Sequence, residues 1–236
     1  MLYVTRLIKE QDGKGYPFSV PAISEMDSVE FTAPVTILCG DNGSGKSTLL
    51  SILAAKLRAV RIGQGIIERE KAADLAQDAF TLHKRASKRN LFFSAEDFIA
   101  YITWVSQTRA EARAEIARID ADDTIADRSY AKMPHLRTLE ELSGLYAQDL
   151  AKQSHGEGFL DFFQSRLNPG GLYLLDEPEG ALSYEKQFAL ALMIQEGAAH
   201  SQFILATHSP ILSAIPGAQI LEATAEGFLP RRYDEL

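Results

Sequence analysis

The sequence is poor in cysteine and in long apolar runs. Cys39 is its only cysteine, so an internal disulfide bond is excluded and a reducing compartment is expected. No apolar run approaches the roughly 20 residues that a membrane-spanning helix needs. The first ten residues, MLYVTRLIKE, alternate as a β-strand does and carry no signal-peptide pattern. Together these absences predict a cytoplasmic protein without a membrane span.

Basic residues are also in short supply. Lys and Arg number 24 against 32 Asp and Glu, and the resulting net charge of −8 argues against broad binding to nucleic-acid phosphates. A local basic groove is compatible with this balance, and its candidate residues are Arg58, Arg61, Lys84, Arg85, Lys88 and Arg89. Internal repeats, low-complexity tracts and Pro-rich linkers are absent as well. We therefore expect residues 1–236 to form one globular domain.

A glycine-rich stretch carries the strongest chemical signal. Residues 40–48 read GDNGSGKST and fit the phosphate-binding pattern G-x-x-x-x-G-K-[ST]. Apolar residues 35–39 precede it as a strand would, and the helix-like LLSILAAKL follows. Glycine lets backbone N–H groups converge on phosphate oxygens, at a helix N-terminus whose dipole favours anions. The expected nucleotide-binding residues of this loop are Asn42, Gly43, Ser44, Gly45, Lys46, Ser47 and Thr48.

A second segment, LYLLDEPE at residues 172–179, supplies carboxylates. Its apolar run predicts a buried strand that ends at Asp176, and an open α/β sheet binds ligands beyond the carboxyl ends of its strands. We expect Asp176 and the Ser47 hydroxyl to hold Mg²⁺, and Lys46 to reach the β- and γ-phosphates of ATP. Glu177 would orient or deprotonate the attacking water. The alternative, two solvated acids at a strand end, is weakened by the presence of the phosphate loop.

Two further segments suggest contacts to phosphate. His208 follows the apolar run QFILA, and a histidine at the carboxyl end of a strand can contact a γ-phosphate or its attacking water. In KQSHGEGF, at residues 152–159, Ser154 and Gly156 open a predicted helix, so that hydroxyl, backbone and helix N-terminus would form a second anion site. The alternatives are a satisfied polar histidine and a simple helix cap.

The segments around these motifs define the expected architecture. Residues 1–35 read as short strands with turns, and Tyr16 within them could stack on an adenine ring or be a core or edge aromatic. Residues 97–151 are helical and polar, which predicts an inserted lobe that is too short for a long coiled-coil arm. Elsewhere strands alternate with helices, and residues 218–224 form the last strand, near the edge. The pattern predicts an α/β P-loop NTPase with a mainly parallel sheet.

As a set, these motifs resemble those of ATPases of the ABC superclass, nearer the SMC and RecF branch than the transporters. Residues 40–48 match Walker A, residues 172–177 match Walker B, and His208 matches the switch histidine. QSHGE at residues 153–157 resembles the LSGGQ signature, and residues 180–183 fall where the D-loop lies. FFSAEDF, GLYLLDEPEGALS and QFILATHSPIL are similar to segments of small bacterial AAA/ABC-type ATPases without coiled-coil arms. The resemblance implies an ABC-type head with an N-terminal antiparallel β part.

Three positions depart from the family pattern. The Q-loop glutamine has no clear match, and Glu96, which could meet Mg²⁺ or the lytic water, is the nearest candidate. The D-loop ends in Ser183, where aspartate is usual, so communication between two sites is expected to differ. His155 replaces a signature glycine. None of these changes removes the residues that hydrolysis requires.

The resemblance also implies an activity: Mg²⁺-dependent hydrolysis of ATP to ADP and phosphate. It implies a nucleotide-dependent homodimer, joined head-to-tail, in which each ATP lies between one subunit's phosphate loop and the other's signature. The signature residues that would act in trans are Ser154, His155, Gly156 and Glu157.

Three biological outputs are compatible with this activity. We expect the ATPase to power or switch a partner in nucleic-acid repair or phage defence. That partner would be a nucleic acid or an effector protein. The alternative is the nucleotide-binding subunit of a membrane transporter, which the altered signature and D-loop disfavour. A non-hydrolysing ATP sensor is a third reading, and an intact Asp176–Glu177 pair argues against it.

Overall fold

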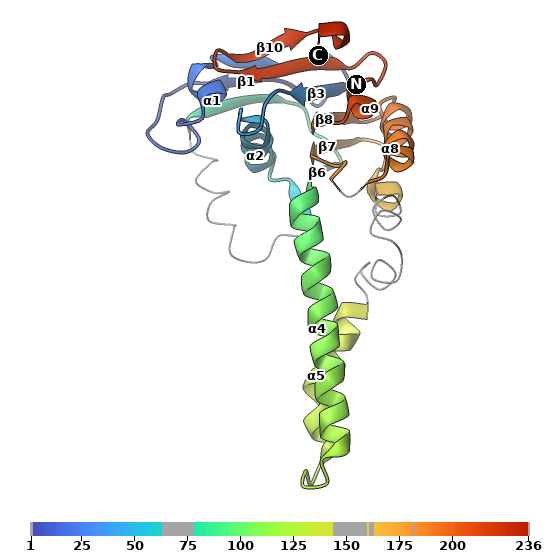
Figure 1. The fold of residues 1–236 in the computed structure, drawn as a ribbon. Coiled ribbons are helices and arrows are strands. Elements are labelled where there is room, and N and C mark those ends of the chain that lie inside the picture. Colours follow the sequence, from blue (N-terminus) through green and yellow to red (C-terminus); the bar gives the residue numbers. More distant parts are fainter. Residues whose placement is uncertain (1, 63–77, 144–159, 161–162, 181, 236) are drawn as a thin grey trace.

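The computed structural model describes residues 2–62, 78–143, 160, 163–180 and 182–235. In these residues the chain forms a seven-stranded sheet, a three-stranded sheet beside it, and two long helices that project away from both sheets (Figure 1). Every pairing in the seven-stranded sheet is parallel except the one at the β10 edge. The expected α/β class with a mainly parallel sheet is confirmed.

The seven-stranded sheet has the order β10-β9-β3-β8-β7-β6-β4. Its three central strands are mainly apolar and are buried along almost their whole length, as expected for parallel strands covered on both faces: β3 Val35–Cys39, β8 Gln202–Ala206 and β7 Gly171–Asp176. On one side lie β6 Arg89–Ser94 and β4 Val60–Ile62; on the other lie β9 Gln219–Thr224 and β10 Gly227–Arg231. The carboxyl ends of β3, β6, β7 and β8 therefore meet at one edge.

Helices cover both faces of this sheet. Alternate residues of a strand point to opposite faces, so Leu38 and Leu174 pack with α2, Lys46–Leu57, while Ile37 and Leu175 pack on the other side with α8, Tyr184–Gly197, and α9, Pro210–Ser213. The helix α2 follows β3 directly, and α8 follows β7 through the turn that carries Glu177. The chain thus delivers its motif residues to the same edge from both layers.

The N-terminal part forms an antiparallel sheet, β2-β1-β5, from β1 Val4–Lys9, β2 Ser28–Glu30 and β5 Phe80–Lys84. This agrees with the antiparallel part that the sequence predicts. The expectation of strands and turns throughout residues 1–35 was wrong at one place, because residues 21–25 form the short helix α1, Pro21–Glu25. Pro21 occupies its first turn, where a missing N–H costs nothing, and Ala22 and Ile23 are buried.

The end of the chain also differs from expectation. The sequence places the last strand at residues 218–224, but β10 follows it as an antiparallel edge strand and the 3-10 helix η2, Tyr233–Glu235, comes after that. Pro230 obscures β10 in the sequence because proline rarely occurs inside strands. At an edge, however, its missing N–H can face solvent, and Pro230 is paired in register with Leu221.

The predicted helical lobe is a hairpin of two helices in its described part, α4 Ala95–Ala121 and α5 Arg128–Ser143, which lie side by side (Figure 1). At 27 residues α4 is about 40 Å long. Ser94 caps α4 by accepting a hydrogen bond from the Asp97 N–H. The hairpin has a thin core, in which Val105 packs on Leu142, and a salt bridge of 2.6 Å joins Lys132 to Asp120 near its tip. The lobe is therefore an arm, and the family resemblance alone did not predict its projection.

Candidate nucleotide site

The phosphate loop connects β3 to α2 and depends on glycine at both ends. Gly40 and Gly45 have φ angles of +119° and +117°, which side chains other than glycine rarely adopt. A Cβ atom on Gly40 would lie 2.7 Å from the carbonyl oxygen of Ala223, and one on Gly45 would lie 2.9 Å from a methyl carbon of Val20. The loop is therefore held in its turn by neighbours that leave no room for a side chain, with the N-terminus of α2 directly behind it.

Lys46 is the first residue of α2 and is almost fully buried. Its ammonium group donates hydrogen bonds of 2.8 Å to the carbonyl oxygens of both Gly40 and Asp41. Burial lowers the pKa of this ammonium group, and the carboxylates of Glu177 and Asp176 oppose that change. The cation thus lies inside the loop, where phosphate oxygens can replace the two carbonyl groups.

Asp176 ends β7 beside the same loop. Its Oδ1 accepts a hydrogen bond of 2.9 Å from the Ser47 hydroxyl, which joins the two segments that the sequence predicts as Mg²⁺ ligands. Burial raises the pKa of Asp176 from 3.8 to about 6, and the Ser47 hydrogen bond only partly offsets this. A carboxylate whose surroundings disfavour its charge is a group that a bound cation would stabilise.

Glu177 and His208 follow Asp176 and β8 at the same edge. Glu177 has a φ angle of +47°, and its N–H donates a hydrogen bond of 2.9 Å to the Ala206 carbonyl of the neighbouring strand. Its Oε1 lies 3.9 Å from Nε2 of His208, and both side chains are about half exposed. Strain in a non-glycine residue is often kept at functional sites. The sharp turn places the carboxylate beside the histidine above the phosphate loop.

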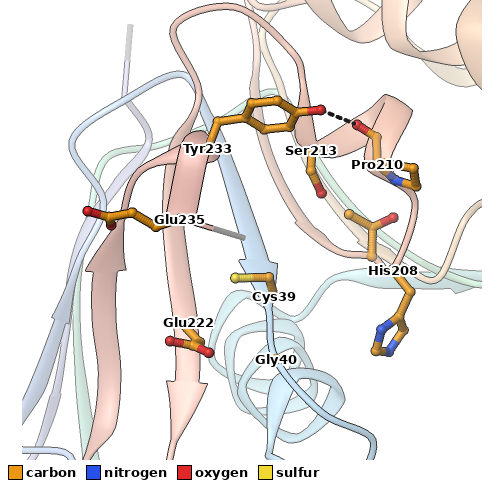
Figure 2. A pocket seen from close by; sticks show the side chains of 9 residues that line it. Cys39, Gly40, His208, Pro210, Ser213, Glu222, Tyr233 and Glu235 are labelled. Atoms are coloured by element: carbon orange, nitrogen blue, oxygen red, sulfur yellow. Dashed lines mark hydrogen bonds between the residues drawn. The ribbon is translucent and has the colours of Figure 1, made fainter.

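These residues surround a cavity of about 600 Å³ lined by Gly40, Asp41, Asn42, Gly43, Glu177 and His208. A second cavity, of about 510 Å³, shares Gly40 and His208 with it (Figure 2). Cys39, Glu222 and Tyr233 are among the residues that line the second cavity, and the Tyr233 hydroxyl donates to the Pro210 carbonyl at 3.5 Å. Burial raises the pKa of the Cys39 thiol, so it is neutral at physiological pH. Of these two cavities, the first is the one lined by the phosphate loop, Glu177 and His208 together.

The structure also gives the positions of Tyr16 and Glu96, the sequence candidates for adenine stacking and for a contact with Mg²⁺ or the lytic water. Tyr16 is 60% exposed, which excludes a core position, and its hydroxyl lies 3.4 Å from Oγ1 of Thr48. Glu96 is exposed in the first turn of α4, two residues after Ser94, which pairs in register with Asp176. Both lie near the edge that carries the loop. The signature residues Ser154, His155, Gly156 and Glu157 lie outside the described residues, so the structure does not place them.

The sequence motifs did not predict a role for Glu179, which also lies at this site. Glu179 accepts a hydrogen bond of 2.6 Å from the backbone N–H of His208. The sequence offered a signal, since a second glutamate follows Glu177 in DEPE, but nothing in the spacing says that its partner is a backbone group 29 positions away.

Comparison with known protein families gives two matches in separate parts of the chain. Residues 22–58 match a family model described as "AAA domain", and residues 158–214 match one described as "AAA domain, putative AbiEii toxin, Type IV TA system". The first range contains the phosphate loop, and the second contains Glu177 and His208. The comparison with curated proteins returned no match.

Comparison with solved structures shows the fold. A putative metal-chelate type ABC transporter in an inward-facing conformation has 17% identity over 99% of this chain and 84% of its own, with a TM-score of 0.51. The ATP-binding cassette of an ABC transporter has 16% identity over 100% of this chain and 93% of its own, with a TM-score of 0.56. An Smc head domain from Pyrococcus furiosus has 16% identity over 98% of this chain and 96% of its own, with a TM-score of 0.45.

The fold and the matches define the class of protein: the chain has the P-loop NTPase fold of ATP-binding cassettes, and two of its segments match AAA-domain models. These findings agree with the resemblance to AAA/ABC-type ATPases that the motifs indicate. Among the described residues, no helix combines the length and apolarity that a membrane crossing requires.

Proposed function

We propose that the protein hydrolyses ATP in a Mg²⁺-dependent reaction at the edge formed by residues 40–48, 176–177 and 208. The observation that carries this proposal is the 2.9 Å hydrogen bond between the Ser47 hydroxyl and Asp176. It joins the phosphate loop to the strand-end carboxylate, which is the pairing that a nucleotide-bound metal ion needs. Lys46 precedes Ser47 in the loop, and Glu177, which follows Asp176, lies 3.9 Å from His208.

The residues present fit Mg²⁺ bound together with nucleotide. Ser47 and Asp176 offer the hard oxygen ligands that Mg²⁺ prefers, and Glu96 is a third candidate ligand. In the described part of the chain no group of three His, Cys, Asp or Glu residues could hold a metal ion. This suits Mg²⁺, which typically takes one or two protein ligands and completes its shell with phosphate and water. When bound, the ion would neutralise charge on the β- and γ-phosphates.

The protein's own groups can then perform phosphoryl transfer to water. Lys46 exchanges its two carbonyl partners for β- and γ-phosphate oxygens, with the N-terminus of α2 behind them. Glu177 orients a water molecule and accepts its proton while the water oxygen bonds to the γ-phosphorus. The bond from that phosphorus to the β,γ-bridging oxygen breaks, and ADP keeps the electron pair. His208, 3.9 Å from Glu177, would contact the γ-phosphate or the water.

The proposal extends to a head-to-tail homodimer that closes around ATP. Its support is the family resemblance: the QSHGE segment, with Ser154 and Gly156, would contact the γ-phosphate of a nucleotide bound to the other copy. Tyr16, exposed near Thr48, would stack on the adenine ring. ATP binding would then join the two copies and hydrolysis would release them.

We further propose that this cycle drives a partner in nucleic-acid repair or phage defence, in the cytoplasm. The description of the family model at residues 158–214 names a type IV toxin–antitoxin protein, which supports a defence role. Two of the solved structures come from transporters, but at 17% and 16% identity they share the fold alone. A transporter subunit is therefore the second candidate, and co-purification with a membrane permease would favour it.

Two variants test hydrolysis at this site. We expect Glu177→Gln to bind ATP while its turnover falls by at least about 100-fold, because the general base is lost. Lys46→Ala should lose tight ATP binding, because the phosphates lose their main cation. Glu196→Gln, an exposed glutamate on α8, is the matched control and should hydrolyse as the wild type does. A phosphate-release assay with ATP and Mg²⁺ measures all three, and near-normal turnover in Glu177→Gln or Lys46→Ala would refute the assignment.

A further inference from the structure

The side chain of Glu179 joins the turn after β7 to the backbone of the loop after β8. Within the turn, the Gly180 N–H donates to the Glu177 carbonyl at 2.9 Å, and the Leu182 N–H donates to the Glu179 carbonyl at 2.8 Å. This arrangement turns the Glu179 side chain toward the neighbouring loop. There its Oε1 accepts the backbone N–H of His208 at 2.6 Å. This carboxylate therefore links the segment of the proposed general base to the backbone of the proposed switch histidine.

A second, buried connection holds the same loop from the other side. The Ser209 hydroxyl donates a hydrogen bond of 2.7 Å to Oε1 of Gln187, and Nε2 of Gln187 donates to the Leu182 carbonyl at 3.0 Å. Both Ser209 and Gln187 are buried. His208 thus lies between two side-chain bonds that run to the turn after β7 and to α8. The backbone of this loop is fixed relative to Glu177 on both sides.

The histidine side chain itself has no comparable restraint. Its imidazole is 44% exposed and its nearest ionisable neighbour, Glu177, lies 3.9 Å away. Side chains that are half exposed gain little from packing, so the backbone position decides where the ring can reach. The hydrogen bond to Glu179 is made by the backbone N–H of His208 itself, so Glu179 restrains the position of this residue directly.

The way Glu179 is buried argues against a purely structural role. Its Oε2 is buried and has no hydrogen-bond partner among the described residues. Leaving a buried carboxylate oxygen unpaired costs stability. A neutral residue would avoid that cost, so folding alone does not explain a glutamate at this position.

We propose that Glu179 is a positioning residue for ATP hydrolysis: it holds the His208 backbone so that the imidazole stays beside Glu177 and the γ-phosphate. This inference rests on the proposed function. It assigns to Glu179 no contact with the reacting atoms. It predicts that Glu179 affects turnover rather than nucleotide binding, and that any side chain with an acceptor oxygen at the same place can substitute for it.

The test compares two substitutions at this position. We expect Glu179→Ala to lower kcat by about 10- to 100-fold, the cost of a misplaced catalytic group, while KM for ATP and binding of a fluorescent ATP analogue change by less than about twofold. Glu179→Gln keeps an acceptor oxygen and should stay within about threefold of the wild-type kcat. Glu196→Ala, also a glutamate truncation, is the control and should leave both parameters unchanged.

A second readout separates this inference from the proposed function. Hydrogen–deuterium exchange of the amide of His208 should be slow in the wild type and in Glu179→Gln, and faster in Glu179→Ala, whether or not the protein hydrolyses ATP. If the wild type exchanges as expected but shows no ATPase activity, the proposed function fails and the tether stands. If Glu179→Ala hydrolyses at the wild-type rate, or Glu179→Gln is as slow as Glu179→Ala, the positioning role is overturned.

Discussion

The environment of the Asp176 carboxyl group lowers the stability of the nucleotide-free protein and suits the binding of a cation. Burial raises its pKa from 3.8 to about 6, so at neutral pH the folded protein holds a carboxylate in surroundings that disfavour its charge. The hydrogen bond from Ser47 compensates only in part. A cation bound with nucleotide would supply the missing compensation.

The sign of this effect leads to a prediction about stability and pH. Because the folded-state pKa lies above the unfolded value, the contribution of Asp176 is fully present below about pH 3.8 and is lost as the pH rises through about 6. At about 1.4 kcal/mol per pKa unit, the loss is at most on the order of 3 kcal/mol. We therefore expect Asp176→Asn, in chelator and without nucleotide, to be more stable than the wild type at pH 7.

Thermal unfolding of both proteins between pH 4 and pH 7.5 measures this, with the interval chosen to span the transition of Asp176. The difference in stability should widen up to about pH 6 and then level off. Adding ATP with Mg²⁺ should stabilise the wild type only. A difference that does not depend on pH, or a less stable Asp176→Asn at pH 7, would contradict the environment inferred for this carboxyl group.

At the scale of residues, the sequence predicted those parts of the site that lie within short motifs. Ser47 and Asp176 belong to motifs whose spacing encodes their geometry, and the structure brings them to 2.9 Å. The bond between Glu179 and the His208 backbone could not be predicted in the same way, because it depends on the strained turn at Glu177 and on the order of strands β7 and β8. Such contacts are set by tertiary structure alone.

At the scale of elements, the proposed nucleotide site and a group of basic residues lie at opposite ends of the strands of the sheet. Helix α2 begins at the phosphate loop and is followed by Arg58, and β6 begins at Arg89 and ends beside Asp176. The β5–β6 connection is joined to the end of α2, since Lys84 donates to the Lys56 carbonyl and Asn90 donates to the Leu57 carbonyl, both at 3.0 Å. The cationic ends of these elements therefore lie together, at the edge opposite the proposed ATP site.

The basic residues at this edge are unusual for an acidic protein. Within the described ranges, the ion pairs involve other cations, and none includes Arg58, Lys84, Arg85, Lys88 or Arg89. Arg61, the sixth sequence candidate, instead packs its guanidinium 4.7 Å from the centre of the Phe92 ring. Cations left without carboxylate partners favour a polyanion such as a nucleic-acid backbone.

We predict that this surface binds a short DNA duplex weakly, with strong dependence on salt and with higher affinity in ATP. The triple variant Arg85→Ala, Lys88→Ala, Arg89→Ala should bind more weakly, and the slope of log affinity against log salt should decrease by about 0.9 for each phosphate contact removed. The matched control is Arg113→Ala, Arg118→Ala, Arg137→Ala, which changes net charge equally on the projecting hairpin. Fluorescence anisotropy measures both; equal losses in the two variants, or tight binding that ignores salt, would refute the assignment.

The elements themselves were predicted unevenly. Strands β3, β7 and β8 were found because strands covered on both faces must be apolar throughout, and α8 was found from its periodicity. Helix α1 is five residues long, and β10 contains Pro230, so neither has enough regular sequence to stand out. The projection of α4 and α5 could not be predicted, because a polar helix has the same sequence pattern on an arm as on a lobe packed against the core.

At the scale of the whole molecule, the proposed nucleotide site lies at the carboxyl ends of the parallel strands and the basic residues lie at the opposite ends. The hairpin of α4 and α5 projects from the same sheet. The arm begins at Ser94, which pairs with Asp176, so a change at the ATP site adjoins the root of α4 (Figure 1). This arrangement suits a switch in which nucleotide changes how two copies meet and a partner reads the change. The proposed switch requires that each ATP is hydrolysed between two copies of the chain.

Mixing two inactive proteins tests that claim most directly. Lys46→Ala should destroy the phosphate loop and leave the signature intact, whereas Ser154→Arg should leave the loop intact and block the signature by bulk. Each homodimer would then have two defective sites. In a mixed dimer, one site collects both defects and the other is assembled from intact halves.

We expect each variant alone to be inactive and the mixture to regain ATPase activity. Random pairing gives about half mixed dimers, each with one working site of two, so about a quarter of the wild-type rate is the ceiling when distant sites act independently. Wild-type activity of Ser154→Arg by itself, or a mixture as inactive as its two components, would contradict a site shared between two copies.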